Sequence, residues 1–194
     1  MKKVAILIFD NVEVLDFAGP FEVFSVSRTP KGEKLYDVSL IAEKEELIRA
    51  RNNFLVQPNL TTDSREKFDM VVVPGGYGTR PLLQNEKIKA WIKTQFEEVE
   101  LMLSVCTGSL VLGSAGLLDD LSATTHHMAF DELKAVAPNT EIIQLVKYVD
   151  NGKVITAAGI SAGIEMALHV VERHHGKEQA ELTARYMEYT WNEA

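Results

Sequence analysis

The chain has little of what several classes of protein require. Among its 194 residues there is one cysteine, which excludes an intrachain disulfide and is typical of proteins from a reducing cytoplasm. No segment approaches the ~20 consecutive apolar residues that a membrane-spanning helix needs. The apolar run at residues 4–9 stops at Asp10 with no small-residue cleavage site after it, which argues against a signal peptide. We therefore expect a cytoplasmic protein that does not bind a membrane.

The chain also lacks a basic excess. Its 28 Asp and Glu residues outnumber its 20 Lys and Arg residues, and the formal net charge at pH 7 is -8. A surface that binds duplex nucleic acid usually carries an excess of positive charge. We therefore expect no nucleic-acid partner, and a small molecule as the ligand.

Short apolar runs alternate with longer helical patterns, and no repeat or linker interrupts them. The predicted strands lie at 4–9, 37–41, 70–73, 101–105 and 154–157, and the predicted helices at 19–27, 86–97, 107–117, 129–136, 160–174 and 177–189. Hairpins are predicted at 46–57 and 146–157, the second around Asn151-Gly152. Several runs are apolar without alternation, as in strands that are covered on both faces. We expect one α/β domain over residues 1–194, with a mainly parallel, doubly wound sheet.

Glycines and chemically capable side chains follow the predicted strands one after another. In an open parallel sheet, ligands bind outside the carboxyl ends of the strands. The sequence therefore predicts one site at that edge of the sheet. The segments that would meet there are Asp10-Asn11, Gly75-Gly76-Tyr77-Gly78, Cys106-Thr107-Gly108, Thr125-His126-His127 and Gly159-Ile160-Ser161.

Cys106 stands at the junction of a predicted strand and a predicted helix. The backbone N–H groups and the macrodipole at a helix start favour a thiolate and lower the pKa of a thiol. Gly108 would let the helix approach the strand closely. The alternative is an inert buried cysteine, because free cysteine is often buried. We interpret Cys106 as a nucleophile and expect its pKa to lie below the ~8.5 of a free thiol.

Two further segments offer groups for chemistry beside such a thiol. The Gly75-Gly76 loop has no Cβ atoms, so it is either a plain turn or, with the amide of Thr107, an oxyanion hole. Asp16 precedes a predicted helix, where it is either the N-cap or a carboxylic acid whose pKa is raised in a closed pocket. Asp10, at the end of the first predicted strand, is a less favoured candidate for the same carboxylic acid.

The histidines fall into two groups. One of His126 and His127 either orients or protonates a ligand, or both are satisfied or capping residues. His169, His174 and His175 share one predicted helix, and the first two are five positions apart, which is not the i,i+4 spacing of a helical metal pair. We interpret these three as surface or interface residues and expect no metal site.

Taken together, these segments resemble the ThiJ/PfpI family of the class I glutamine-amidotransferase-like superfamily. The resemblance covers most of the chain, and it implies a flavodoxin-like three-layer α/β/α sandwich, a cysteine on a nucleophile elbow and usually a homodimer. The motifs that carry it are Leu15-Asp16-Phe17-Ala18-Gly19-Pro20, Val73-Pro74-Gly75-Gly76, Ser104-Val105-Cys106-Thr107-Gly108-Ser109, Ala123-Thr124-Thr125-His126 and Gly159-Ile160-Ser161-Ala162-Gly163-Ile164.

Within that family the sequence is most similar to the isocyanide hydratase branch. The similarity implies that Cys106 attacks the carbon of an isocyanide, forms a thioimidate and yields an N-substituted formamide. It implies that Asp16 supplies a proton and later helps to activate water, with no cofactor and no metal. The other residues implied at the site position the substrate or stabilise the intermediate, and they are Thr107, Gly75, Gly76, His126 and Ile160.

Departures from the family pattern leave other functions open. Peptidase-like members place a histidine where this chain has Thr107, and glyoxalase-type members use a glutamate where it has Asp16, so amidase, peptidase-like and glyoxalase activities are less favoured. AraC-type regulators share the elbow but continue into a helix-turn-helix domain, for which we expect no room after Ala194. A redox sensor with a reversibly oxidised Cys106 is the non-enzymatic alternative.

Overall fold

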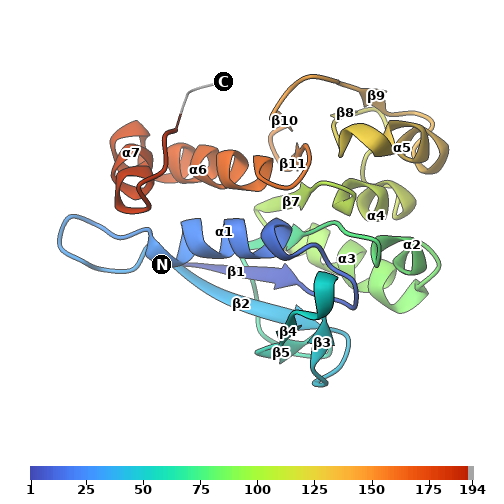
Figure 1. The fold of residues 1–194 in the computed structure, drawn as a ribbon, viewed down its shortest axis with the longest axis horizontal. Coiled ribbons are helices and arrows are strands. Elements are labelled where there is room, and N and C mark those ends of the chain that lie inside the picture. The colour runs from blue at the N-terminus through green and yellow to red at the C-terminus, as the bar shows by residue number, and fades with distance from the viewer. Residues whose placement is uncertain (192–194) are drawn as a thin grey trace.

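The computed structural model describes residues 1–191 and arranges them in three layers around a central sheet (Figure 1). Within those residues, the sheet has seven strands in the order β10-β11-β7-β6-β1-β2-β5. Neighbouring strands are parallel except for the β10–β11 pair. This confirms the mainly parallel sheet. The strands are β1 (Lys2–Leu7), β2 (Tyr36–Ala42), β5 (Leu60–Thr61), β6 (Met70–Val73), β7 (Leu101–Val105), β10 (Tyr148–Asp150) and β11 (Val154–Ala157).

Helices cover the sheet on both faces, which confirms the flavodoxin-like sandwich. On one face, α6 (Ala162–His175) packs against α1 (Val14–Val26) and α7 (Lys177–Tyr186). On the other, α4 (Gly108–Ser114) contacts α2 (Thr79–Leu82), α3 (Glu86–Glu98) and α5 (Phe130–Val136). Across residues 1–191, no helix combines the length and the apolar character needed to cross a lipid bilayer.

The central strands are buried along their whole length. Every residue of β6 and β7 is buried. Parallel strands between two helical layers lose both faces from water, which explains why these runs show no polar alternation. The result is a rigid support for the turn that follows β7.

Both predicted hairpins are present. In the first, β3 (Ile48–Arg49) and β4 (Leu55–Val56) are antiparallel and enclose the 3₁₀ turn η1 (Arg51–Asn53). The second is β10–β11, with Gly152 at a φ of +85° in its turn. Outside the main sheet, β8 (Ser122–Ala123) pairs with β9 (Glu141–Ile142), and η2 (His127–Ala129) precedes α5.

The predicted start of the first helix is wrong. The sequence predicts a start at Gly19, directly before Pro20. The helix instead begins at Val14 and continues through Pro20. Because Pro20 has no N–H group, it cannot bond the carbonyl oxygen of Asp16. Since α1 begins at Val14, Asp16 lies in its first turn and not before the helix.

The surface interpretation of the late histidines is wrong for His174. Its side chain is 6% exposed, with Nδ1 3.1 Å from the Tyr36 hydroxyl and Nε2 3.2 Å from Glu100 Oε1. Burial lowers the pKa of His174, and the Glu100 charge opposes that shift. His175 is exposed. A one-dimensional pattern did not reveal that Tyr36, from β2, would cover His174.

Candidate active site

Cys106 forms the sharp turn between β7 and α4. Its φ of +55° lies in the left-handed region, which residues other than glycine rarely adopt. The Cys106 N–H donates to the carbonyl oxygens of Ala157 at 3.1 Å and Ala158 at 3.0 Å. Its own carbonyl oxygen accepts from Thr125 Oγ1 at 2.9 Å and Ser109 Oγ at 3.1 Å. These bonds hold a strained conformation of the kind that gathers at functional sites.

Two glycines let three segments meet at this turn. A Cβ at Gly108 would lie 1.9 Å from the carbonyl oxygen of Val73, so this glycine lets α4 approach β6 closely. A Cβ at Gly75 would lie 2.5 Å from the Thr107 nitrogen and 2.8 Å from Asp16 Oδ2. Gly75 is therefore the contact point of the β6 loop, the cysteine turn and α1.

Asp16 is fully buried against the turn, which rules out the N-cap interpretation. The N-cap position belongs to Glu13, whereas Asp16 Oδ2 accepts a hydrogen bond from the Gly75 N–H at 2.9 Å. Oδ1 has no hydrogen-bond partner among the residues that the structure describes. Burial raises the pKa of Asp16 to about 7, while the bonds to Gly75 and Cys106 oppose that shift. Asp16 can therefore hold a proton near neutral pH.

The predicted low pKa of the thiol is wrong. Burial, followed by the negative charge of Asp16, raises the pKa of Cys106 to about 12. Hydrogen bonds from the backbone N–H groups of Thr107 and Ile160 lower it by less. The effect of the Asp16 charge disappears when that carboxyl is protonated, so the two groups titrate as a pair. The neutral thiol is therefore the favoured form at neutral pH.

The amides of Gly75 and Gly76 already have protein partners. The Gly75 N–H binds Asp16, and the Gly76 N–H donates to Thr107 Oγ1 at 3.0 Å. Thr107 Oγ1 in turn donates to the Gly76 carbonyl oxygen at 3.2 Å. In this arrangement the two glycine amides position Asp16 and Thr107. The N–H groups that face the sulfur are those of Thr107 and Ile160.

Ile160 and His126 form another part of the wall around the thiol. Ile160 has a φ of +50°, a second left-handed residue beside Cys106. His126 Nδ1 accepts from the Met128 N–H at 3.3 Å, so a neutral ring carries its proton on Nε2. Burial, followed by the nearby His127, lowers the pKa of His126 and favours the neutral ring. A Cβ at Gly159 would lie 2.4 Å from His126 Cδ2, so this glycine lets the ring pack closely.

The cavity that contains Cys106 has a volume of about 320 Å³, and His126 lines it while His127 does not. Tyr77 and Met128 also line the cavity, and 64% and 79% of their surface is exposed. Most of the newly found wall comes from separate helical segments that only the fold brings together. Among these residues only Tyr77, beside the Gly-Gly turn, had a sequence signal. The lining residues that sequence reasoning missed are Glu13, Arg51, Tyr77, Arg80, Met128, Ala129 and Glu132.

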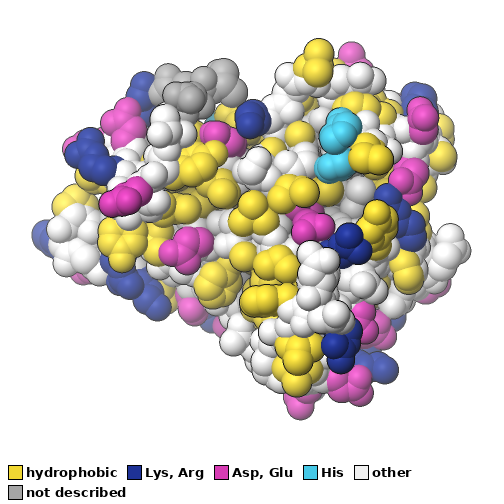
Figure 2. Space-filling view, in the orientation of Figure 1, with side chains coloured by type: hydrophobic (Ala, Val, Ile, Leu, Met, Phe, Trp, Pro, Cys, Tyr) yellow, Lys and Arg dark blue, Asp and Glu magenta, His cyan; other side chains and the backbone are white. Residues whose placement is uncertain are grey.

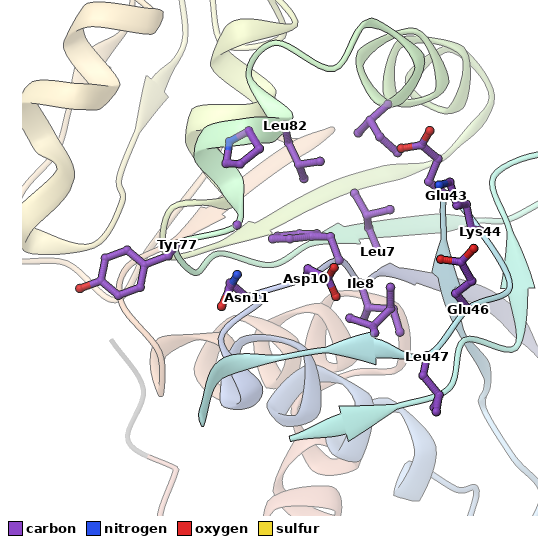
Figure 3. A pocket seen from close by; sticks show the side chains of 15 residues that line it. Leu7, Ile8, Asp10, Asn11, Glu43, Lys44, Glu46, Leu47, Tyr77 and Leu82 are labelled. Carbon is purple, nitrogen blue, oxygen red and sulfur yellow. The ribbon is translucent and has the colours of Figure 1, made fainter. Parts of the chain in front are cut away.

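A second cavity, of about 340 Å³, shares Tyr77 with the first (Figure 3). Its wall includes Asp10, Glu43 and Leu47, and Cys106 does not line it. Asp10 Oδ1 accepts a hydrogen bond from the Arg49 N–H at 2.8 Å. Asp10 therefore is not the acid beside the thiol. Within residues 1–191, no three His, Cys, Asp or Glu side chains gather closely enough to hold a metal ion.

Comparison with known proteins places these features in context. The model of the DJ-1/PfpI family matches residues 2–173. The isonitrile hydratase of Pseudomonas putida is 32% identical over 192 residues, which cover 96% of this chain and 78% of that protein. Among solved structures, a ThiJ/PfpI family protein from Pseudomonas syringae matches with a TM-score of 0.87 and 24% identity, over 99% of this chain and 76% of that one.

Other relatives belong to different functional classes. The HTH-type transcriptional regulator GbdR of Pseudomonas aeruginosa is 25% identical over 177 residues, which cover 91% of this chain but 48% of that protein. The chain thus spans about half the length of this regulator. The glutathione-independent glyoxalase DJR-1.2 of Caenorhabditis elegans is 29% identical over 117 residues, or 58% of each chain.

Proposed function

The chain belongs to the DJ-1/PfpI family, and from this premise we propose that it is a cysteine-dependent enzyme that hydrates an isocyanide to an N-substituted formamide. One observation carries the proposal: the buried Asp16 carboxyl beside Cys106, with a pKa of about 7 and with Oδ1 unpaired among the described residues. Similarity to the isonitrile hydratase of Pseudomonas putida supports the choice of substrate. The reaction needs a nucleophile and a group that exchanges protons at neutral pH.

In the first step, Cys106 Sγ bonds to the terminal carbon of the isocyanide. Asp16 gives its proton to that carbon and takes the proton of the thiol, so its own protonation state is unchanged. The product is a thioimidate, in which the former isocyanide carbon carries one hydrogen, the sulfur and the nitrogen. This exchange lets a thiol with a raised pKa react without forming a free thiolate.

In the second step, water adds to the thioimidate carbon. Asp16 takes a proton from the water as it gives one to the nitrogen. The carbon–sulfur bond then breaks, the sulfur takes the hydroxyl proton, and the formamide leaves. The N–H groups of Thr107 and Ile160 stabilise negative charge on the sulfur in both steps. Gly75 and Gly76 act through Asp16 and Thr107, and His126 helps to place the substituent of the substrate.

The raised pKa of the buried thiol argues against the redox-sensor alternative. Peroxide oxidises the thiolate, and the raised pKa of Cys106 lowers the fraction of the thiol in that form. Glyoxalase activity is the enzymatic alternative, and the similarity to DJR-1.2 favours it over peptidase or amidase activity.

The test is to incubate the purified protein with an aromatic isocyanide and to follow the N-formyl product, with Cys106→Ala as the blank. We expect product from the wild type and none from the variant. Absence of product from a wild type whose Cys106 still reacts with iodoacetamide would overturn the proposal. Conversion of methylglyoxal by the same preparation would then identify the glyoxalase alternative.

We also propose that the chain forms a homodimer through the face that carries α1 and α6. Figure 2 shows hydrophobic side chains gathered on this face, where Leu15, Ala18, Phe21 and Ile164 are incompletely buried. Apolar surface of this kind is typical of contacts between subunits. Sedimentation analysis tests the proposal, and a monomer at micromolar concentration would contradict it. A cytoplasmic location stays a prediction from the sequence.

A further inference from the structure

The charged side chains around the Cys106 cavity are not equivalent, and the difference bears on the substrate. They are Glu13, Arg51, Arg80 and Glu132. Arg80 Nε and Nη2 donate to Glu132 at 2.9 and 2.6 Å, and Nη1 donates to the Gly76 carbonyl oxygen at 3.1 Å. The Glu132 carboxylate neutralises the guanidinium charge, and the Gly76 carbonyl oxygen occupies a further N–H donor. Arg80 therefore fastens the Gly76 loop to α5 and has little left to offer a ligand.

Within residues 1–191, Arg51 has a single acidic partner, Glu13, and the contact is long. Its guanidinium carbon lies 4.2 Å from the centre of the Tyr77 ring, and Nε lies 3.7 Å from Glu13 Oε2, beyond hydrogen-bond distance. Among the described residues, no hydrogen bond is made by its side chain. The contact with the Tyr77 ring places the guanidinium in the wall of the cavity, where its Nη donors have no hydrogen-bond partner among the described residues.

The backbone holds Arg51 at this place. The Arg51 N–H donates to the Val12 carbonyl oxygen at 3.0 Å, and the Ala50 N–H donates to the Phe54 carbonyl oxygen at 2.8 Å. Asn52 and Asn53 follow with φ of +56° and +63°. Consecutive left-handed residues cost free energy and persist where the surrounding structure fixes them, which is common at ligand clamps. The loop thus fixes the backbone from which the Arg51 side chain extends to the cavity.

The other groups around the cavity also favour a ligand that accepts hydrogen bonds. The neutral ring of His126 offers its Nε2–H, and the Ile160 N–H faces the sulfur. Glu13 is the one carboxylate of the cavity's described lining that Arg80 does not bind, and its contact with Arg51 is loose. A bidentate carboxylate is a better partner for Arg51 than Glu13, whereas a cation at Glu13 would meet the charge of Arg51.

We propose that the substrate of Cys106 carries a carboxylate, which Arg51 binds at the cavity mouth while the isocyanide carbon reaches the sulfur. This rests on the proposed function and narrows its substrate class to isocyano carboxylates. The cavity of about 320 Å³ is large enough for such a small acid. In this proposal Arg51 is the residue that selects substrates with a negative charge.

The test compares iodoacetate with iodoacetamide, which alkylate Cys106 through the same carbon and leaving group and differ in charge. Changes in thiol reactivity cancel in the ratio of the two rates. We expect Arg51→Gln to lower the iodoacetate/iodoacetamide ratio by about tenfold or more, since it removes a charge-assisted hydrogen bond. Arg65→Gln is the matched control, because Arg65 is exposed and lines neither cavity. Its ratio should equal that of the wild type.

A ratio that Arg51→Gln leaves unchanged overturns the proposal, as does an equal fall of both rates. If Arg51→Gln does not fold, Arg51→Lys and a salt titration of the wild type replace it: both should lower the ratio, and constancy in both would contradict the proposal. Turnover of isocyanoacetate and of its methyl ester then separates the two claims. Failure of both substrates with a shifted alkylation ratio refutes the hydratase and leaves the carboxylate site standing. Turnover of both with no effect of Arg51→Gln on their relative kcat/KM refutes the carboxylate site alone.

Discussion

Asp16 and Asp150 experience opposite environments in one molecule. Asp150 accepts hydrogen bonds from the Gly152 N–H at 2.7 Å and from Arg173 Nη1 at 2.9 and 3.0 Å, and it lies 2.7 Å from His169 Nε2. Partial burial raises its pKa, but these partners outweigh that effect and lower it overall. Asp16 has no charged partner within residues 1–191: it accepts a hydrogen bond from the Gly75 N–H and interacts with Cys106, and burial raises its pKa to about 7.

The difference shows how a fold assigns structure and chemistry to the same side chain. Asp150, at the end of β10, joins the β10–β11 hairpin to α6 through partners on both elements. Asp16 accepts a backbone hydrogen bond from Gly75 and interacts with the Cys106 side chain, and its Oδ1 has no partner among the described residues. A carboxylate with many partners stays ionised and stabilises the fold, whereas one with few can carry a proton to a reacting atom.

The largest expected effect separates the two carboxylates by activity. Asp16→Asn should lower kcat for formamide formation by ~10²–10⁴, because a positioned proton transfer is lost. Asp150→Asn is the matched control, with the same chemical change far from the cavity, and should leave kcat nearly unchanged. The measurement is product formation at saturating isocyanide. An equal loss of kcat in the two variants would contradict a catalytic role that belongs to Asp16 and not to Asp150.

The glycines next to these carboxylates should behave differently as well. Gly75→Ala should lower kcat/KM by ~10²-fold or more, since its Cβ would displace the Thr107 amide and Asp16 and small misplacements are costly in an active site. At Gly152 an added Cβ would have no atom within 4 Å. The φ of +85° makes alanine strained at this position, which does not line the Cys106 cavity. Gly152→Ala should lower thermal stability and leave kcat/KM intact. Full activity in Gly75→Ala would contradict the close contact of Gly75 with Thr107 and Asp16.

A third expected effect concerns stability at alkaline pH. The folded pKa of Asp16 lies above its unfolded value, so the native state binds more protons and its stability falls as pH rises from about 4 to 7. Asp16→Asn removes this loss. It should stabilise the protein at pH 8 by up to a few kcal/mol, at ~1.4 kcal/mol per pKa unit, and by less at pH 5. Urea unfolding at both pH values measures the difference, and an equal effect at both would contradict a raised pKa.

The smallest expected effect has the opposite sign. Asp150→Asn should destabilise the protein by about 1–2 kcal/mol at pH 8, because Arg173 and His169 lose a partly exposed partner. A lowered carboxyl pKa contributes stability above the unfolded pKa, and that contribution is lost as pH falls through the folded pKa. The destabilisation should therefore fade in acid. If Asp150→Asn instead stabilised the protein at pH 8, the contacts of Asp150 with His169 and Arg173 would not be what stabilises the hairpin against α6.

The parts of the fold that local patterns determine were predictable. The buried strands, both hairpins and the Cys106 turn follow from apolar runs, the Asn-Gly pair and the strand-helix junction. The start of α1 was not predictable, because Pro20 inside a helix is tolerated only through tertiary packing. The same holds for the pKa of Cys106, since its burial and the nearness of Asp16 outweigh the effect of the helix start. Arg51 lies in the β3–β4 hairpin, far from Cys106 in the sequence, and nothing in the neighbouring residues indicates that it lines the cavity.

The dependence of kcat/KM on pH tests the central claim most directly, namely that a protonated Asp16 serves Cys106. Formamide formation by the wild type should be constant at mildly acid pH and fall about tenfold per pH unit above about 7, as Asp16 loses its proton. A profile that stays flat or rises through pH 9, where the thiol gains reactivity, would contradict the account.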